Sequence, residues 1–286
     1  MPILRHWTVG HSRALSLGPK AVIMGIVNAT PDSFSGDGLA ANIDAAIAQA
    51  VAMVKQGAAI IDVGGESTRP DAEPVNAALE QERILPVIEG VRAISDVLIS
   101  VDTYRAETAR RAVESGAHII NDVWGLSRDP AIARLVAETG SGLVIMHTGR
   151  SRKKLPDVID DQRHFLVQAI EVARNASIRD EQIVLDPGFG FAKETAEENI
   201  ELMERFGELL DLDFPWLVGA SRKRFLGAVT GQAPLERDGA TAATSIALRL
   251  AGADIFRVHD VVSSRDALAV ADAMLAARAR RQGRNG

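Results

Sequence analysis

Gly57-Ala58-Ala59-Ile60-Ile61-Asp62-Val63, Gly116-Ala117-His118-Ile119-Ile120-Asn121-Asp122 and Gly252-Ala253-Asp254-Ile255-Phe256-Arg257-Val258 are three versions of one sequence unit. Each unit begins with a glycine that follows a segment of helical period. Glycine takes the left-handed conformation of a helix C-terminal cap at the least cost. A run of apolar residues begins two or three positions later and predicts a core strand. The unit therefore predicts that the chain passes repeatedly from a helix into a buried strand.

Similar apolar runs occur along the whole chain, and few of them alternate with polar residues. Such runs are typical of parallel strands that are covered on both faces. The eight runs are residues 22–26, 60–63, 98–101, 119–123, 143–146, 183–185, 217–218 and 255–258. Segments of helical period lie between them, at residues 43–55, 106–114, 131–138, 162–175, 196–210, 241–250 and 265–277. Eight strand–helix units in a chain of 286 residues predict an α/β fold, a single (β/α)8 TIM barrel.

A doubly wound sheet is the competing fold, but no Pro/Gly/Ser-rich linker marks a domain boundary. We therefore expect one domain over residues 1–286, with residues 1–20 as an N-terminal lead-in and residues 279–286 as a disordered tail. Hydrophobic residues make up 47% of the chain and charged residues 24%, a balance that excludes a disordered protein.

The charge and cysteine content exclude several classes of function. With 32 Lys and Arg against 38 Asp and Glu, the net charge of −6 gives no general attraction for nucleic acid or a membrane surface. The absence of cysteine excludes disulfides, thiolate catalysis and cysteine-bound metals, and it favours a cytoplasmic location. The first 31 residues contain no Asp or Glu, as in an organellar presequence, but polar residues interrupt each of their apolar runs.

Polar or charged residues follow all eight apolar runs, and a barrel carries its chemistry at these carboxyl ends of its strands. Asp102, Asn121 and Asp186 supply carboxylates and an amide, which suit a flat heterocycle with several N–H donors. The basic turn 221–224 and residues 257–259 follow the last two runs, where such barrels usually bind phosphate. The sequence thus predicts a nitrogen heterocycle on the barrel axis and an anionic group at the rim.

Several other polar residues allow a structural as well as a functional interpretation. Asp62 and Asp122 have apolar neighbours, and they are equally compatible with core carboxylates held by backbone N–H groups and with direct ligands. His118 and His164 lie in or beside helical stretches, so we expect them at the surface. The basic run 152–154 is typical of a solvated loop.

The stretch Met24-Gly25-Ile26-Val27-Asn28-Ala29-Thr30-Pro31-Asp32-Ser33-Phe34-Ser35 closely resembles the dihydropteroate synthases, which are pterin-binding barrel enzymes of folate biosynthesis. The resemblance continues in order through residues 62–70, 100–103, 121–123, 146–147, 186–193, 219–224 and 257–260, and it covers nearly the whole chain. The chain departs from the family pattern in Ser35-Gly36-Asp37-Gly38 and, after His147, in Thr148-Gly149-Arg150.

The resemblance implies a transferase that condenses 6-hydroxymethyl-7,8-dihydropterin diphosphate with para-aminobenzoate, with Mg²⁺, to give 7,8-dihydropteroate and pyrophosphate. It implies departure of the diphosphate before the amine attacks, a homodimer, and a target for sulfonamides. The implied pterin-binding residues are Asp102, Asn121, Met146, Asp186, Phe191 and Lys223. The implied diphosphate-binding residues are Asn28, Thr68, Arg257 and His259, with Asn28 also at the metal. The implied para-aminobenzoate-binding residues are Thr68, Arg69, Pro70, Phe191, Ser221 and Arg222, and the implied catalytic residues are Asp102, Lys223 and Arg257.

Two other functions remain alternatives. A pterin-binding methyltransferase domain of the cobalamin-dependent kind shares the barrel, but it normally lacks the Ser-Arg-Lys turn and the Thr-Pro-Asp-Ser-Phe segment that this chain has. A synthase paralogue that binds pterin without catalysis is excluded only weakly by the sequence.

Overall fold

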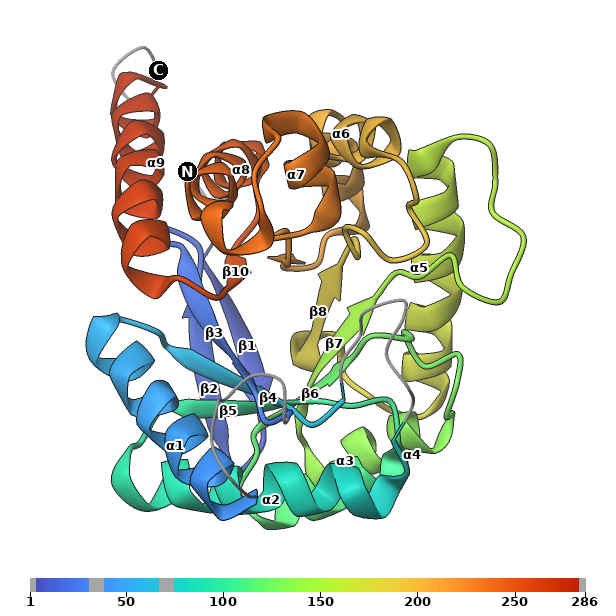
Figure 1. Cartoon of the computed structure of the whole chain (residues 1–286). Coiled ribbons are helices and arrows are strands. Elements are labelled where there is room, and N and C mark those ends of the chain that lie inside the picture. The colour runs from blue at the N-terminus through green and yellow to red at the C-terminus, as the bar shows by residue number, and fades with distance from the viewer. Residues whose placement is uncertain (1–3, 31–38, 67–74, 283–286) are drawn as a thin grey trace.

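The computed structural model describes residues 4–30, 39–66 and 75–282 and forms a ring of parallel strands surrounded by helices (Figure 1). The strands are β1 (Arg5–Val9), β2 (Arg13–Leu17), β3 (Val22–Asn28), β4 (Ile60–Gly64), β5 (Leu98–Asp102), β6 (Ile119–Asp122), β7 (Gly142–Met146), β8 (Ile183–Asp186), β9 (Leu217–Val218) and β10 (Ile255–Val258). The helices are α1 (Leu39–Gln56), α2 (Ala77–Ile94), α3 (Ala106–Glu114), α4 (Ala131–Thr139), α5 (Val158–Asn175), α6 (Ala196–Glu204), α7 (Arg224–Thr230), α8 (Asp238–Ala251) and α9 (Val261–Gln282). Short 3-10 turns lie at Asp180–Gln182, Phe206–Leu212 and Pro234–Glu236.

The eight strands of the barrel are hydrogen-bonded in the order β8-β7-β6-β5-β4-β3-β10-β9. A single parallel bridge between Leu185 and Trp216 joins β8 to the segment before β9 and completes the ring. This arrangement confirms the predicted (β/α)8 barrel. It also confirms the repeated sequence unit, because Gly57, Gly116 and Gly252 have φ values of 113°, 115° and 117° between a helix and a strand.

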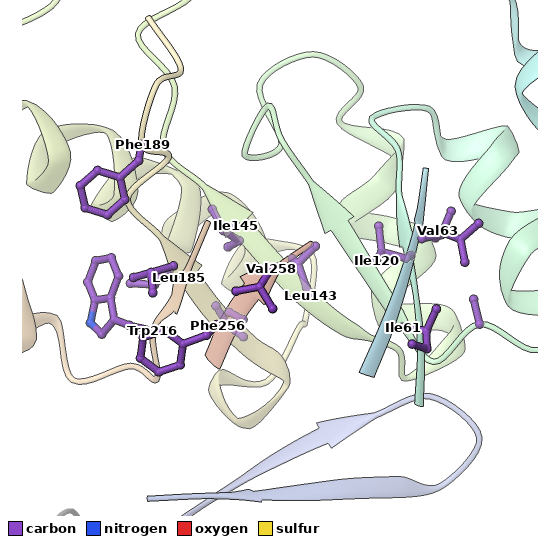
Figure 2. Packing of buried hydrophobic residues seen from close by; sticks show 14 of the residues in the cluster. Ile61, Val63, Ile120, Leu143, Ile145, Leu185, Phe189, Trp216, Phe256 and Val258 are labelled. Atoms are coloured by element: carbon purple, nitrogen blue, oxygen red, sulfur yellow. The ribbon is translucent and has the colours of Figure 1, made fainter. Parts of the chain in front are cut away.

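Two apolar layers stabilise the barrel. The larger one lies between the strands and the surrounding helices, and Figure 2 shows part of it around Leu185, Trp216 and Phe256. The smaller layer fills the bottom of the barrel with side chains such as Ile60, Leu98 and Val184. Because both faces of the strands are covered, the apolar runs need no polar alternation.

The N-terminal lead-in is itself structured. Strands β1 and β2 form an antiparallel hairpin whose side chains Trp7, Val9 and Leu17 belong to the layer at the bottom of the barrel. The Trp7 indole N–H donates to the carbonyl of Gln182 at 2.8 Å, next to the start of β8. The hairpin thus covers the end of the barrel opposite the carboxyl ends of the strands.

Three elements differ from the expectation. Helix α2 was not predicted, because Pro86 lies inside it and proline normally ends a helix. The short helix α7 was not predicted either. The prediction of a disordered tail from residue 279 is wrong at its start, since α9 continues to Gln282. Within the described ranges, no helix is long and apolar enough to cross a membrane.

Candidate active site

A layer of polar side chains lies on the apolar floor inside the barrel. Successive side chains of a strand point to opposite faces, so a residue two positions beyond an inward apolar residue also points inward. Four strands place an apolar residue in the floor and a polar residue above it: Ile60 and Asp62, Ile119 and Asn121, Val184 and Asp186, and Ile255 and Arg257. This polar layer faces the mouth of the barrel.

Arg257 connects the acidic groups of this layer. Its Nε donates to Oδ2 of Asp62 at 2.6 Å, and its terminal nitrogen donates to Oδ2 of Asp102 at 2.7 Å. Burial alone would lower the pKa of Arg257, but the charges of Asp62 and Asp102 outweigh it and hold this pKa above its usual value. Arg257 is therefore a permanent cation at the centre of the site.

The two readings of Asp62 and Asp122 are now resolved. Asp62 is fully buried and is held by side chains, namely Arg257 and the amide of Asn121 at 3.2 Å. Asp122 accepts from the backbone N–H groups of Trp124 and Leu126 at 2.8 and 2.7 Å, as expected of a structural carboxylate. Asp62 supports the polar layer, while Asp122 shapes the loop after β6.

Two further carboxylates end their strands with little exposure. Asp186 accepts from the backbone N–H of Gly188 at 2.7 Å, and it pairs in register with Met146 on β7. Burial raises the pKa of Asp186 to about 6, and burial raises the pKa of Asp102 to about 7 against the opposing charge of Arg257. Burial disfavours the charged form of a carboxylate, and a ligand that donates N–H groups to it would stabilise that form.

Asn121 provides a further hydrogen-bond acceptor for a ligand. Its amide nitrogen donates to Asp62, whereas its buried Oδ1 has no hydrogen-bond partner among the described residues. An unpaired buried oxygen costs stability, and a ligand with an N–H group would remove that cost. Asn121 and Asp186 therefore fit the predicted heterocycle.

Phe191 lies beneath two cations at the mouth. The ammonium of Lys223 is 4.0 Å from the centre of the Phe191 ring, and the guanidinium carbon of Arg150 is 5.0 Å from it. Arg150 also lies 4.0 Å from the centre of the Trp124 ring. Burial lowers the pKa of Lys223 to about 8, with a further contribution from Arg257. Arg150 was not among the predicted site residues, although it marks one of the departures from the family pattern.

The predicted anion site at β9 and β10 is only partly free. Ser221 Oγ lies 2.9 Å from His259 Nδ1 and accepts from the His259 backbone N–H at 3.1 Å. Arg222 forms a bidentate ion pair with Asp238, with both distances at 2.7 Å. Burial lowers the pKa of His259 to about 3, so this imidazole is neutral at physiological pH.

The remaining predicted residues are placed as follows. Asn28 ends β3, half-buried, beside Gly64. Thr68, Arg69 and Pro70 lie outside the described residues, as does the departure at residues 35–38.

A buried polar cluster beside the site was missed by the sequence reasoning. His147 is 1% exposed, and its Nε2 lies 3.0 Å from Asp161, while its Nδ1 lies 3.1 Å from the ammonium of Lys193. Arg152 donates to Asp161 at 2.6 and 2.8 Å. The interpretation of residues 152–154 as a solvated run is therefore wrong for Arg152, because a buried carboxylate in α5 attracts it inward.

The two helical-stretch histidines have different outcomes. His164 is exposed, as predicted. His118 is buried, which corrects the expectation, because its Nδ1 accepts the backbone N–H of Ile99 at 3.1 Å beneath the N-terminal hairpin.

The barrel and its polar layer define a class of enzyme that binds a nitrogen heterocycle at the carboxyl ends of the strands. A family model described as pterin binding enzyme matches residues 24–259. A dihydropteroate synthase of Synechocystis is 44% identical over 264 residues, covering 90% of this chain and 91% of its own length. That of Bacillus subtilis is 43% identical, covering 92% and 91%.

Solved structures agree with these relatives. The Clostridium difficile dihydropteroate synthase, crystallised in the presence of pteroic acid, has a TM-score of 0.86 at 42% identity and covers 89% of this chain and 97% of its own. The Xanthomonas albilineans dihydropteroate synthase with 4-aminobenzoic acid has a TM-score of 0.87 at 39% identity, covering 93% and 96%. The chain belongs to the pterin-binding enzymes and, within them, to the dihydropteroate synthase family of transferases.

Proposed function

We propose that this chain condenses 6-hydroxymethyl-7,8-dihydropterin diphosphate with para-aminobenzoate. The observation that carries this proposal is the set of buried acceptors, Asp102, Asn121 Oδ1 and Asp186, around the cation of Arg257. The pterin ring has N–H donors that these acceptors would take up. Met146 and Phe191 would provide the walls of the pocket, and Lys223 would donate to an acceptor on the ring.

The diphosphate group would lie on the side of the mouth formed by Asn28, Arg257 and His259, with Thr68 as a further contact. Arg257 is a fixed cation, so it would balance the charge that accumulates on the leaving group. His259 is neutral and would act as a hydrogen-bond donor. Phe191, Ser221 and Arg222 would contribute to the para-aminobenzoate site, together with Thr68, Arg69 and Pro70, which lie outside the described residues. Because Arg222 is paired with Asp238, it would line this site without contributing a free positive charge.

We further propose that the diphosphate departs before the amine attacks. Loss of the diphosphate leaves a cation on the exocyclic methylene of the pterin, and the charges of Asp102 and Asp186 would stabilise it. No side chain has to act as a nucleophile. Incubation with labelled pyrophosphate in the absence of para-aminobenzoate tests this order, because exchange of label into the pterin diphosphate requires reversible departure.

Mg²⁺ fits the residues at this position. Within the described ranges, no group of three or more His, Asp or Glu side chains could hold a metal. Asn28 nevertheless offers an amide oxygen at the end of β3, and Mg²⁺ commonly uses one or two protein oxygens together with substrate phosphates. When bound there, the ion would neutralise negative charge on the diphosphate.

Three coarser features complete the proposal. We propose a homodimer, as the family resemblance implies, and sedimentation analysis tests it. We also propose a cytoplasmic location, which the lack of cysteine favours. A Yersinia pestis dihydropteroate synthase, 35% identical with a TM-score of 0.87, has been solved with a sulfonamide drug, and we propose that sulfonamides also bind this chain.

One experiment tests the reaction and separates the synthase from a silent paralogue. The protein is mixed with the dihydropterin diphosphate and Mg²⁺, and para-aminobenzoate is then added. Simultaneous appearance of pyrophosphate and dihydropteroate supports the proposal. Binding of pterin without either product would instead support a non-catalytic paralogue.

A further inference from the structure

The loop that follows Asp186 at the end of β8 carries Phe191 into the site, and one buried ammonium donates to two of its carbonyl groups. Lys193 is 4% exposed, and its Nζ donates to the carbonyls of Gly188 at 2.9 Å and Phe191 at 3.5 Å. Its third acceptor is Nδ1 of His147 at 3.1 Å. An ammonium has three hydrogens, so each of them has one acceptor.

His147 is prepared for this contact from its other side. Its Nε2 lies 3.0 Å from Asp161 Oδ2 and 2.7 Å from a terminal nitrogen of Arg152, which itself donates to that carboxylate. With the Nε2 proton directed to Asp161, Nδ1 is left as the acceptor that Lys193 requires. The backbone of His147 also contributes, because its N–H donates to the carbonyl of Asp186 at 2.8 Å. His147 thus contacts Asp186 through its backbone and Lys193 through its side chain.

Other contacts also anchor the turn between Asp186 and Phe191: Phe189 is fully buried, Gln162 donates to the carbonyl of Pro187 at 3.0 Å, and the Gly190 N–H donates to Asn199 at 2.7 Å. Gly188 has a φ of 64°, and a Cβ there would lie 2.2 Å from the carbonyl of His147, so the turn approaches β7 with no side chain between them. On the other side of Lys193 and His147 lies a cavity of about 160 Å³. This cavity borders Lys193 and His147 and not the turn itself, so loss of the Lys193 hydrogen bonds would act on the turn at the carbonyls of Gly188 and Phe191.

Burying the charged ammonium of Lys193 costs folding free energy. All three acceptors of Lys193 are neutral, and burial lowers its pKa to about 7 despite the charges of Asp186, Glu198 and Asp161. A charged group without a paired carboxylate costs folding stability that an apolar residue would not. The hydrogen bonds gained at this cost in folding free energy are those to the loop between Asp186 and Phe191.

We propose that Lys193, oriented by His147, is a positioning residue that sets the pterin-binding geometry of Asp186 and Phe191. This inference rests on the proposed role of Asp186 toward the pterin. The described hydrogen bonds of the Lys193 ammonium go to His147 and to the loop, so its effect on the site would pass through the loop.

The test compares Lys193→Met with Lys153→Met by calorimetry. Lys153 lies in a neighbouring loop with an exposed side chain, so this control removes the same charge without touching the network. The probes are a dihydropterin without its diphosphate, and pyrophosphate with Mg²⁺, each titrated into the whole protein. We expect Lys193→Met to weaken pterin binding about tenfold, as loss of charged hydrogen bonds would, and pyrophosphate binding less than twofold.

A merely structural role would weaken both ligands together or leave pterin binding unchanged, and either result overturns the proposal. If Lys193→Met does not fold, His147→Phe provides the test, since it keeps the ammonium and the packing of the ring and removes one acceptor. There we expect a loss of about threefold for pterin alone. Failure of the unaltered protein to bind the dihydropterin would contradict the proposed function instead.

Discussion

Arg257 reaches from β10 past β3 to Asp62 on β4, and its Nε lies 2.6 Å from the carboxylate Oδ2. The same guanidinium contacts Asp102 on β5, so one side chain joins three strands that are far apart in the sequence. The binding site and the ion pairs that join the polar layer therefore both depend on the guanidinium of Arg257. Changes at Arg257 should therefore affect stability and binding together.

Arg257→Met should destabilise the fold by roughly 3–5 kcal/mol, because it leaves the fully buried Asp62 without its cation. Urea denaturation measures this loss. Adding Asp62→Asn to the same chain should recover part of the stability, since one of the two carboxylates that lost their cation is then neutral. No recovery in the double variant would contradict the assignment.

In the folded fraction of Arg257→Met, pyrophosphate binding should fall more than binding of a dihydropterin without diphosphate. The reason is that the proposed role of Arg257 is to balance the charge of the diphosphate. Calorimetry with the two ligands decides the question. Equal losses would mean that Arg257 acts only on the structure.

Pterin affinity should depend on pH through Asp186. Its pKa is raised to about 6 by burial, so the carboxylate takes up a proton as the pH falls through that value. A neutral carboxyl accepts N–H donors less well, and affinity should drop up to roughly tenfold per pH unit below pH 6. Asp186→Asn should bind weakly and lose the fall in affinity near pH 6, while a fall near pH 7 that comes from Asp102 remains. An unaltered protein whose affinity is constant from pH 8 to pH 5 would rule the assignment out.

The two substrate sites should be thermodynamically coupled through Ser221 and His259. These residues lie 2.9 Å apart, and one is assigned to para-aminobenzoate and the other to the diphosphate. Para-aminobenzoate should bind more tightly when pyrophosphate and Mg²⁺ are present, and by linkage it should tighten pyrophosphate by the same factor. Ser221→Ala should reduce this factor. Identical affinities with and without pyrophosphate would show that the sites are independent.

Arg105 holds the residues on either side of segment 67–74. It donates to the carbonyl of Val75 at 2.6 Å and forms an ion pair with Glu66 at 2.7 Å. Arg105→Met should raise the KM for para-aminobenzoate by roughly five- to tenfold and leave pterin affinity unchanged. Arg110→Met is the control, because Arg110 lies in α3, the helix that begins after Arg105, and its ion pair with Glu138 of α4 is exposed. A similar change in both variants would argue against the assignment of Thr68, Arg69 and Pro70.

Arg249 should matter for stability only. It is 2% exposed between α8 and α9, with Asp272 at 2.7 Å and the carbonyl of Gly18 at 2.6 Å. Arg249→Met should lower the free energy of unfolding by about 3–5 kcal/mol, since Asp272 loses its partner. Activity per folded molecule should stay the same. A change in KM with unaltered stability would contradict this.

The strands and most helices could be predicted because their signals are local. A glycine cap followed by an apolar run needs only neighbouring residues, and Gly57, Gly116 and Gly252 behave as expected. Helix α2 was lost because Pro86 is normally a local signal for a helix end. Packing overrides that signal, as Ile84, Val87 and Ile88 around the proline are fully buried.

The site could be predicted where it depends on strand ends, and not where it depends on partners distant in sequence. Asp102, Asn121 and Asp186 converge as expected. The ion pair of Arg257 with Asp62 joins residues 195 positions apart, and the contact of Lys193 with His147 joins residues 46 apart. Charge runs are equally dependent on context, since Asp161 decides the position of Arg152.

The hairpin of β1 and β2 gives the barrel a closed bottom, so the described part of the chain offers its ligands one route, through the mouth. The proposed pterin site lies on the polar layer inside the barrel, and we place para-aminobenzoate above it, toward the mouth. A ligand bound above would block the pterin, which implies ordered kinetics with the dihydropterin diphosphate binding first. Dihydropteroate fills both levels and should therefore leave last, competing with the dihydropterin diphosphate in product inhibition.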